Sequence, residues 1–195
     1  AVCIESGTTT ELNAADYFAA NGLDYNPIVF IDQDEVVKAY EDGRCDVYTT
    51  DASGLAATRA TFKDPQNWVV LPEIISKEPL GPVTRQGDDQ WGDVIRWTKN
   101  ALLAAEELGV TQSNVEKMAS KPGPNPEINR LLGTEGNLGG MLGLDKRWAV
   151  NAIKAVGNFG EIFERNIGKN TPVGLERGVN DLWTKGGLQY TPPFR

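Results

Sequence analysis

Histidine is absent from the 195 residues, and its absence excludes two large classes of functional site. Serine-type catalytic triads need an imidazole as general base, and many zinc sites need one as a metal ligand. Cysteine is nearly absent as well, because only Cys3 and Cys45 occur. Two cysteines so far apart, without histidine, make a poor zinc site. We therefore expect neither a histidine-dependent enzyme nor a bound metal or other cofactor.

Basic charge and long hydrophobic runs are also scarce. The 19 lysines and arginines are outnumbered by 27 acidic residues, which gives a net charge of −8. An acidic chain is poorly suited to the phosphate backbone, so we expect no nucleic-acid partner. No uninterrupted apolar run approaches the roughly 20 residues that a membrane-spanning helix needs.

The negative charge is concentrated in the first part of the chain. Residues 1–80 carry 5 basic and 14 acidic side chains, whereas residues 81–195 carry 14 and 13. Such a difference predicts that the two parts face different surroundings. The chain also opens on a strand pattern, without an initiator methionine or a signal peptide. We expect that upstream sequence has been removed or lies on another chain.

Strand and helix patterns alternate through the first part. Thr8 and Glu11, and again Asp32 and Glu35, have the spacing of a helix capping box. Strands are predicted at residues 2–4, 27–31 and 46–49, and helices at residues 8–20, 32–43 and 52–62. Short strands separated by helices of about ten residues predict an α/β fold with a parallel sheet.

The remainder of the chain is predicted to be mostly helical. Helical patterns cover residues 88–108, a short stretch from Asn125-Pro126, residues 148–167 and residues 179–183. Two further strands are predicted at residues 68–71 and 80–83, a glycine-rich loop at residues 133–143, and an extended tail at residues 189–195.

Two polar segments follow predicted strands. The first, residues 6–11, reads Ser-Gly-Thr-Thr-Thr-Glu and opens a helix, where free backbone N–H groups and hydroxyls favour an anion such as a carboxylate. The alternative is a well-capped helix with a polar first turn. The second is Asp51, whose carboxylate could hold an ammonium group at the same edge of a parallel sheet. Its alternative is a helix N-cap. Together the two segments describe a receptor for a zwitterion.

Cys3 and Cys45 both stand at the start of predicted strands. The first and third strands of a doubly wound sheet are usually neighbours, so the sulfurs would lie together at the edge opposite the ligand. These positions favour a disulfide, and with it an oxidising compartment, over two buried free thiols.

At these residues the sequence resembles the general L-amino-acid binding proteins of ABC transporters. The resemblance extends over essentially the whole chain and is strongest at residues 2–11, 43–51, 71–82, 155–161 and 186–193. It implies a periplasmic-binding-protein-like lobe with a doubly wound parallel sheet, followed by a mostly helical part. Residues 1–75 would form the second, ligand-binding lobe. Residues 76–195 would form the hinge return, that is, the segment that crosses the hinge back to the first lobe, together with the remainder of the first lobe and a helical extension. The N-terminal part of the first lobe would be absent.

The resemblance also implies the ligand and its contacts. The α-carboxylate of an L-amino acid would lie at Thr9, aided by the neighbouring donors Ser6, Gly7, Thr8 and Thr10, and its α-ammonium group at Asp51. The arginine and the aromatic residues that the family places on the first lobe have no counterpart here. The expected function is periplasmic capture of L-amino acids and delivery to a membrane permease, without catalysis. Other expected partners are the missing first-lobe segment or another copy of the chain.

Two other functions remain open at this point. One is an interaction subunit or fragment without transport-competent binding. The other is a small-molecule lyase on the same fold, which would need a general acid or base besides Asp51. No such second group is evident among the residues present.

Overall fold

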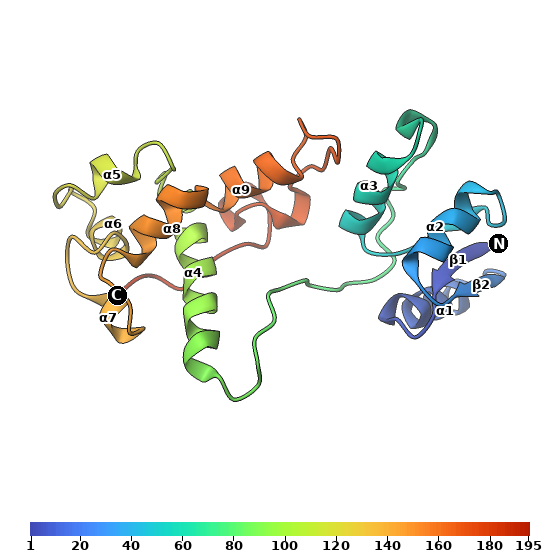
Figure 1. Cartoon of the computed structure of the whole chain (residues 1–195), viewed down its shortest axis with the longest axis horizontal. Coiled ribbons are helices and arrows are strands. Elements are labelled where there is room, and N and C mark those ends of the chain that lie inside the picture. Colours follow the sequence, from blue (N-terminus) through green and yellow to red (C-terminus); the bar gives the residue numbers. More distant parts are fainter. The chain divides into compact units, whose positions relative to one another are not determined.

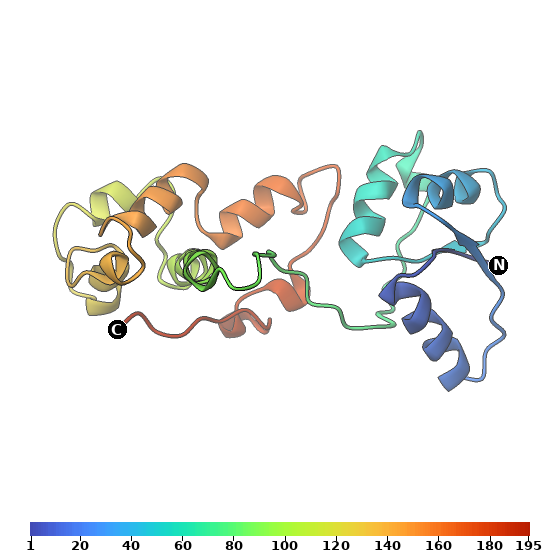
Figure 2. The same ribbon diagram turned by 60° about the horizontal axis from the view of Figure 1, so that its bottom comes forward.

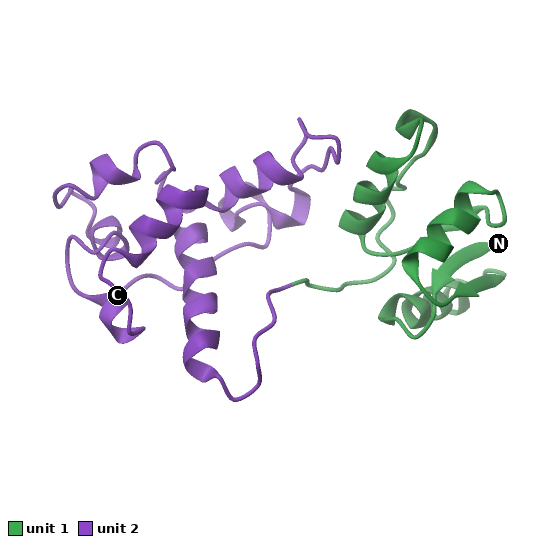
Figure 3. Ribbon diagram, in the orientation of Figure 1, with its two compact units in different colours: residues 1–80 green, residues 81–195 purple.

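The computed structural model describes all 195 residues and divides them into two compact units, residues 1–80 (unit 1) and residues 81–195 (unit 2) (Figure 3). Unit 1 is built from strands and helices, whereas unit 2 consists of helices and turns (Figure 1). This confirms the predicted fold class, an α/β part followed by a mostly helical part. Neither unit contains a helix with the length and apolar character needed to cross a bilayer.

The centre of unit 1 is a three-stranded parallel sheet in the order β2-β1-β3. Its strands are β1 (Val2–Glu5), β2 (Pro27–Phe30) and β3 (Val47–Tyr48), and its helices are α1 (Thr9–Ala20), α2 (Gln33–Glu41) and α3 (Ala52–Thr61). The connection through α1 leads from the central strand β1 to the edge strand β2, and the connection through α2 leads back in the opposite direction, past β1 to the other edge strand β3. Right-handed crossovers of this kind put the two helices on opposite faces of the sheet, as Figure 2 shows.

The sheet buries both of its faces at β1. Cys3 is fully buried and packs with Val36 and Ala39 of α2. Because alternate residues of a strand point to opposite faces, Val2 and Ile4 face the side that α1 covers, and both are buried. Burial on both faces therefore fixes the position of β1, and the candidate site begins directly after this strand.

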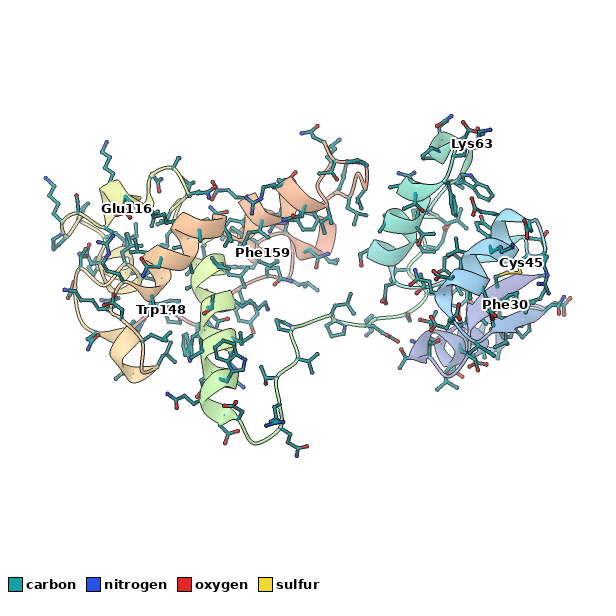
Figure 4. All side chains as sticks on the ribbon, in the orientation of Figure 1. Phe30, Cys45, Lys63, Glu116, Trp148 and Phe159 are labelled. Carbon is teal, nitrogen blue, oxygen red and sulfur yellow. A yellow bond between two sulfur atoms is a disulfide. The ribbon has the colours of Figure 1, made fainter.

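A disulfide joins Cys3 to Cys45, with the Cα atoms 5.6 Å apart (Figure 4). The predicted pairing is confirmed, and the alternative of two free thiols is wrong. The bond closes a loop with a sequence separation of 42 residues. In the chain-entropy model, closing a loop of this size stabilises the folded state by about 4 kcal/mol.

Unit 2 is organised around α4 (Asp89–Glu107), the longest helix of the chain. The other helices of this unit are α5 (Val115–Met118), α6 (Pro126–Leu131), α7 (Leu138–Met141), α8 (Trp148–Val156) and α9 (Phe159–Asn166). The core of unit 2 gathers small residues of α4, such as Ala101 and Ala105, against Val150 and Ile153 of α8. Small side chains on α4 let the two helices approach closely.

A buried ion pair fastens the C-terminal segment to α4 and α9. The guanidinium of Arg177 donates to both carboxylate oxygens of Glu106, at 3.0 and 3.2 Å, and the two side chains are only 10% and 9% exposed. The same guanidinium lies over the rings of Phe159 and Phe163, 5.4 and 5.2 Å from their centroids. Phe159 is marked in Figure 4. This arrangement combines a bidentate charge pair with two cation–π contacts.

The two strands predicted at residues 68–71 and 80–83 are wrong, because no strand pairs with either segment. Both segments are exposed, and the side chains of Val69, Leu80 and Val83 are 74%, 70% and 95% accessible. Their apolar, β-branched residues favour an extended backbone, but a strand also needs a hydrogen-bonding neighbour.

Three predictions of helix and loop also need correction. The helix predicted at residues 148–167 is broken into α8 and α9 at Gly157, whose φ of +84° is left-handed, and Asn158 starts a new capping box. The predicted loop at residues 133–143 contains the single-turn helix α7, capped by Asn137. The helix predicted at residues 179–183 is replaced by two 3-10 turns, Gly178–Asn180 and Trp183–Lys185.

Replacing Asn158 with alanine should lower the free energy of unfolding of unit 2 by about 2 kcal/mol. The buried Asn158 amide accepts a hydrogen bond from the Glu161 N–H at 2.9 Å and donates one to the Val110 carbonyl at 2.8 Å. Urea unfolding followed by circular dichroism measures the loss. The matched control is Asn166→Ala, because this exposed amide bonds only the Ile162 carbonyl of its own helix. Equal losses in the two variants would contradict the structural role of Asn158.

Candidate functional site

The two predicted binding segments meet at one edge of the sheet. β1 and β3 are parallel neighbours, and the Thr49 N–H donates to the Cys3 carbonyl at 3.4 Å just beyond the paired residues. The turn into α1 follows β1, and Asp51 follows β3 by three residues. Ligands of α/β folds usually bind at this carboxyl edge of the strands. The topology therefore places both segments where the sequence predicted them.

Part of the predicted donor set is used by the turn itself. The Thr8 hydroxyl donates to the Glu5 carbonyl at 2.9 Å and accepts from the Glu11 N–H at 3.2 Å, which makes Thr8 the N-cap of α1. The Gly7 N–H donates to the Glu11 carboxylate at 2.8 Å, and the Ser6 N–H donates to the Phe30 carbonyl at 2.8 Å. The N–H of Gly7 and the hydroxyl of Thr8 thus hold the turn together, and the N–H of Ser6 ties the start of the turn to β2.

Several donors are left for an anion. Thr9 and Thr10 occupy the first turn of α1, where backbone N–H groups have no acceptor within the helix. The backbone N–H of Thr8 and the hydroxyl of Ser6 also have no hydrogen-bond partner within the chain. The Thr9 side chain is exposed and that of Thr10 is half-buried. Of the five predicted residues, Ser6, Thr8, Thr9 and Thr10 therefore keep a donor for an anion, whereas the N–H of Gly7 is committed to Glu11.

A carboxylate of the same chain contacts this helix end. Glu78 accepts a hydrogen bond from the Thr9 hydroxyl at 2.8 Å and another from the Asn13 side-chain amide at 2.5 Å. Sequence reasoning missed both Glu78 and Asn13. Glu78 lies 69 residues from Thr9, in a segment without regular structure, and no local spacing rule connects the two. Only the resemblance, which includes residues 71–82, could have drawn attention to Glu78.

The half-buried Asp51 stands at the N-cap position of α3, but its carboxylate makes no capping hydrogen bond. Only its backbone carbonyl contributes to the helix, by accepting from the Leu55 N–H at 2.8 Å. Asp51 thus occupies the N-cap position that the alternative interpretation gave it, but its side chain does not cap the helix. A carboxylate without a capping role at the carboxyl edge of the sheet is free to accept hydrogen bonds from an ammonium group.

The surroundings of this edge are acidic and partly aromatic. Burial raises the pKa of the Tyr48 phenol above its ordinary value, and the charges of Glu5 and Asp51 add to the rise. The phenol therefore stays protonated at neutral pH. The ring of Tyr40 lies 6.1 Å from that of Tyr48 and packs at a tilt against Trp68, with centroids 5.0 Å apart, and Trp68 is the single tryptophan of unit 1. The acidic surroundings favour a cationic group over a second anion beside Asp51.

No protein-family model matches the chain. The chain is 60% identical over its whole length to the general L-amino acid-binding periplasmic protein AapJ of Rhizobium johnstonii. It is 55% identical to the glutamate/glutamine/aspartate/asparagine-binding protein BztA of Rhodobacter capsulatus. It is 53% identical to the putative amino-acid ABC transporter-binding protein YhdW of Escherichia coli. The chain spans 57% of the length of each of these relatives.

The chain is also similar to a solved structure of a periplasmic binding protein. The chain superposes with a TM-score of 0.93 and 57% identity on an ABC transporter periplasmic binding protein from Brucella ovis with glutathione bound, matching 100% of this chain and 60% of that one. These similarities confirm the resemblance noted from the sequence, and the periplasmic origin of the relatives confirms the predicted location. With 53–60% identity along its whole length to such proteins, the chain belongs to the family of periplasmic binding proteins of amino-acid ABC transporters.

Proposed function

We propose that the chain binds L-amino acids for a membrane permease, through the α-carboxylate at Thr9 and Thr10 and the α-ammonium group at Asp51. One observation carries this proposal. The free backbone N–H groups at the start of α1 and the uncapped carboxylate of Asp51 follow the ends of two neighbouring parallel strands. Donors for an anion beside an acceptor for a cation match the two charges that every free amino acid carries.

The same charges explain why the site needs a second wall. The Thr9 side chain is exposed and Asp51 is only half-buried, so water would screen a ligand bound to unit 1 alone. We propose that residues 1–75 are the second lobe of the family and residues 76–195 the hinge return and the remainder of the first lobe. A first-lobe segment or another copy of the chain would then cover the ligand.

Recognition of the α groups alone leaves the side chain free to vary. One relative is named for general L-amino-acid binding and another for four different amino acids. The structural relative holds glutathione, whose γ-glutamyl residue keeps both a free α-ammonium and a free α-carboxylate group. We therefore propose broad side-chain tolerance, with the two α groups as the required part of the ligand.

Calorimetric titration of the full encoded polypeptide that contains these 195 residues tests the proposal. L-Glutamate, L-glutamine and glutathione should bind, because each presents both α groups. N-Acetyl-L-glutamate lacks the ammonium group and isoglutamine lacks the α-carboxylate, so each should bind at least about tenfold more weakly, a loss of about 1.4 kcal/mol. If N-acetyl-L-glutamate bound as tightly as L-glutamate, the role given to Asp51 would be excluded. If isoglutamine bound as tightly as L-glutamate, the role given to Thr9 and Thr10 would be excluded.

A further inference from the structure

We propose that the carboxylate of Glu78 holds the place of the ligand's α-carboxylate at α1 and is displaced when an amino acid binds. This inference rests on the proposed function and adds to it an internal competitor and a coupled movement. Three features of the molecule support it: the contacts of Glu78, the single proton of the Thr9 hydroxyl, and the lack of other attachments in the segment that carries Glu78.

The contacts of Glu78 resemble those expected for a bound ligand carboxylate. Thr9 and Asn13 are four residues apart, so their side chains share one face of α1. The Thr9 hydroxyl donates to one carboxylate oxygen of Glu78 at 2.8 Å, and the Asn13 amide donates to the other at 2.5 Å. Both oxygens of one carboxylate are thus satisfied at the helix end where the ligand's carboxylate is proposed to bind.

The Thr9 hydroxyl cannot bind the carboxylate of Glu78 and the carboxylate of a ligand at the same time. A threonine hydroxyl carries one proton, so it donates one hydrogen bond. The Thr9 proton is already directed at Glu78. A ligand carboxylate at the same hydroxyl would also lie a few ångströms from the charge of Glu78, and like charges at that distance repel. Binding of an amino acid through the Thr9 hydroxyl therefore requires Glu78 to leave.

The segment around Glu78 has little else to hold it. Residues 69–87 contain no helix or strand, and the hydrogen bonds of Glu78 to α1 are the only ones made by side chains of this segment. No ion pair involves these residues, and Ile74 and Leu80 on either side are 73% and 70% exposed. Displacing Glu78 would release the stretch of chain that leads out of unit 1. Ligand binding at α1 would thereby be linked to the freedom of this segment.

The first test compares Glu78→Gln with Glu73→Gln in the full encoded polypeptide. Both variants remove one negative charge from the same segment, but Glu73 is exposed and makes no hydrogen bond or ion pair. Glutamine at position 78 keeps the size of the side chain and weakens its hold on Thr9, because hydrogen bonds to charged groups are about twice as strong as neutral ones. We expect Glu78→Gln to bind L-glutamine roughly five- to tenfold more tightly and Glu73→Gln to match the natural chain.

Each other outcome of this titration has a defined meaning. Equal dissociation constants for Glu78→Gln and Glu73→Gln would overturn the displacement and leave the proposed function standing. Weaker binding by Glu78→Gln would also overturn it, since Glu78 would then assist the ligand. Failure of the natural chain and of both variants to bind any amino acid would refute the proposed function and the displacement together.

A second test needs no ligand. Trypsin cleavage after Lys77 reports how firmly the segment is held, and Asn13→Ala removes one of its two attachments without altering the cleavage site. We expect cleavage at least about threefold faster in Asn13→Ala than in Asn26→Ala, a control whose exposed amide makes no hydrogen bond. Addition of L-glutamine to the natural chain should accelerate the same cleavage. An unchanged rate in Asn13→Ala, or protection by L-glutamine, would overturn the proposal.

Discussion

Replacing Asp51 with alanine is expected to weaken amino-acid binding by about 2–5 kcal/mol, roughly 30-fold or more in Kd. The variant would leave the ligand's ammonium group without its carboxylate once the site is covered. Thr10→Ala removes only a neutral hydroxyl and should weaken binding by about 1 kcal/mol. Calorimetric titration of L-glutamate into the full encoded polypeptide measures both losses.

Stability measurements separate this role from a structural one. Because the Asp51 carboxylate makes no capping hydrogen bond, Asp51→Ala should leave the thermal midpoint of unit 1 unchanged. Asp64→Ala is the matched control, since this exposed aspartate also precedes a helical turn, the 3-10 turn Pro65–Asn67, without capping it. Equal losses of affinity in Asp51→Ala and Thr10→Ala, or a lower midpoint with an unchanged Kd, would contradict the binding role.

Arg177→Met should destabilise unit 2 by about 3–5 kcal/mol, the loss that follows removal of one partner from a buried ion pair. Methionine fills much of the same space but leaves the carboxylate of Glu106 buried without its bidentate donor. Lys185 compensates only in part, because its ammonium group lies 3.6 Å from Glu106 on a side chain that is 57% exposed. Urea unfolding followed by far-ultraviolet circular dichroism gives the free energy.

The control for this prediction is Lys169→Met. Lys169 pairs with Glu176 at 2.9 Å, but both side chains are more than 70% exposed, and exposed pairs contribute little to stability. A second variant, Arg177→Met with Glu106→Leu, removes both charges and should recover most of the loss. If Arg177→Met were no more destabilising than Lys169→Met, the ion pair would not hold the C-terminal segment in place.

Much of unit 1 could be predicted because its signals are local. The caps at Thr8 and Asp32 lie next to the helices that they start, and both are observed as N-caps. Three short apolar runs separated by such helices left few arrangements other than a parallel sheet. The pairing of Cys3 with Cys45 followed from the same strand positions. The two segments of the candidate site, at Thr9 and Asp51, were found because they stand directly after strands.

Features that depend on distant contacts could not be predicted. The hydrogen bond between Thr9 and Glu78 joins residues 69 apart, and the ion pair between Arg177 and Glu106 joins residues 71 apart. The break at Gly157 was missed for another reason. The apolar period continues across it, although Asn158 and Glu161 have capping-box spacing that a search for helix starts would have found. The prediction of one continuous helix followed the apolar period and overlooked the local signal for a helix end at Gly157.

The disulfide determines at which step the chain loses the conformational entropy of ordering the candidate site. β3 pairs with β1 through only two residues, so this edge strand would open readily on its own, carrying Asp51 away from α1. The link from Cys3 to Cys45 ties the chain to β1 two residues before β3 begins. Most of the conformational entropy of β3 and Asp51 is therefore lost once, when the disulfide forms, and not again each time a ligand binds. Reduction would reverse this order, and each binding event would then have to order β3 and Asp51 anew.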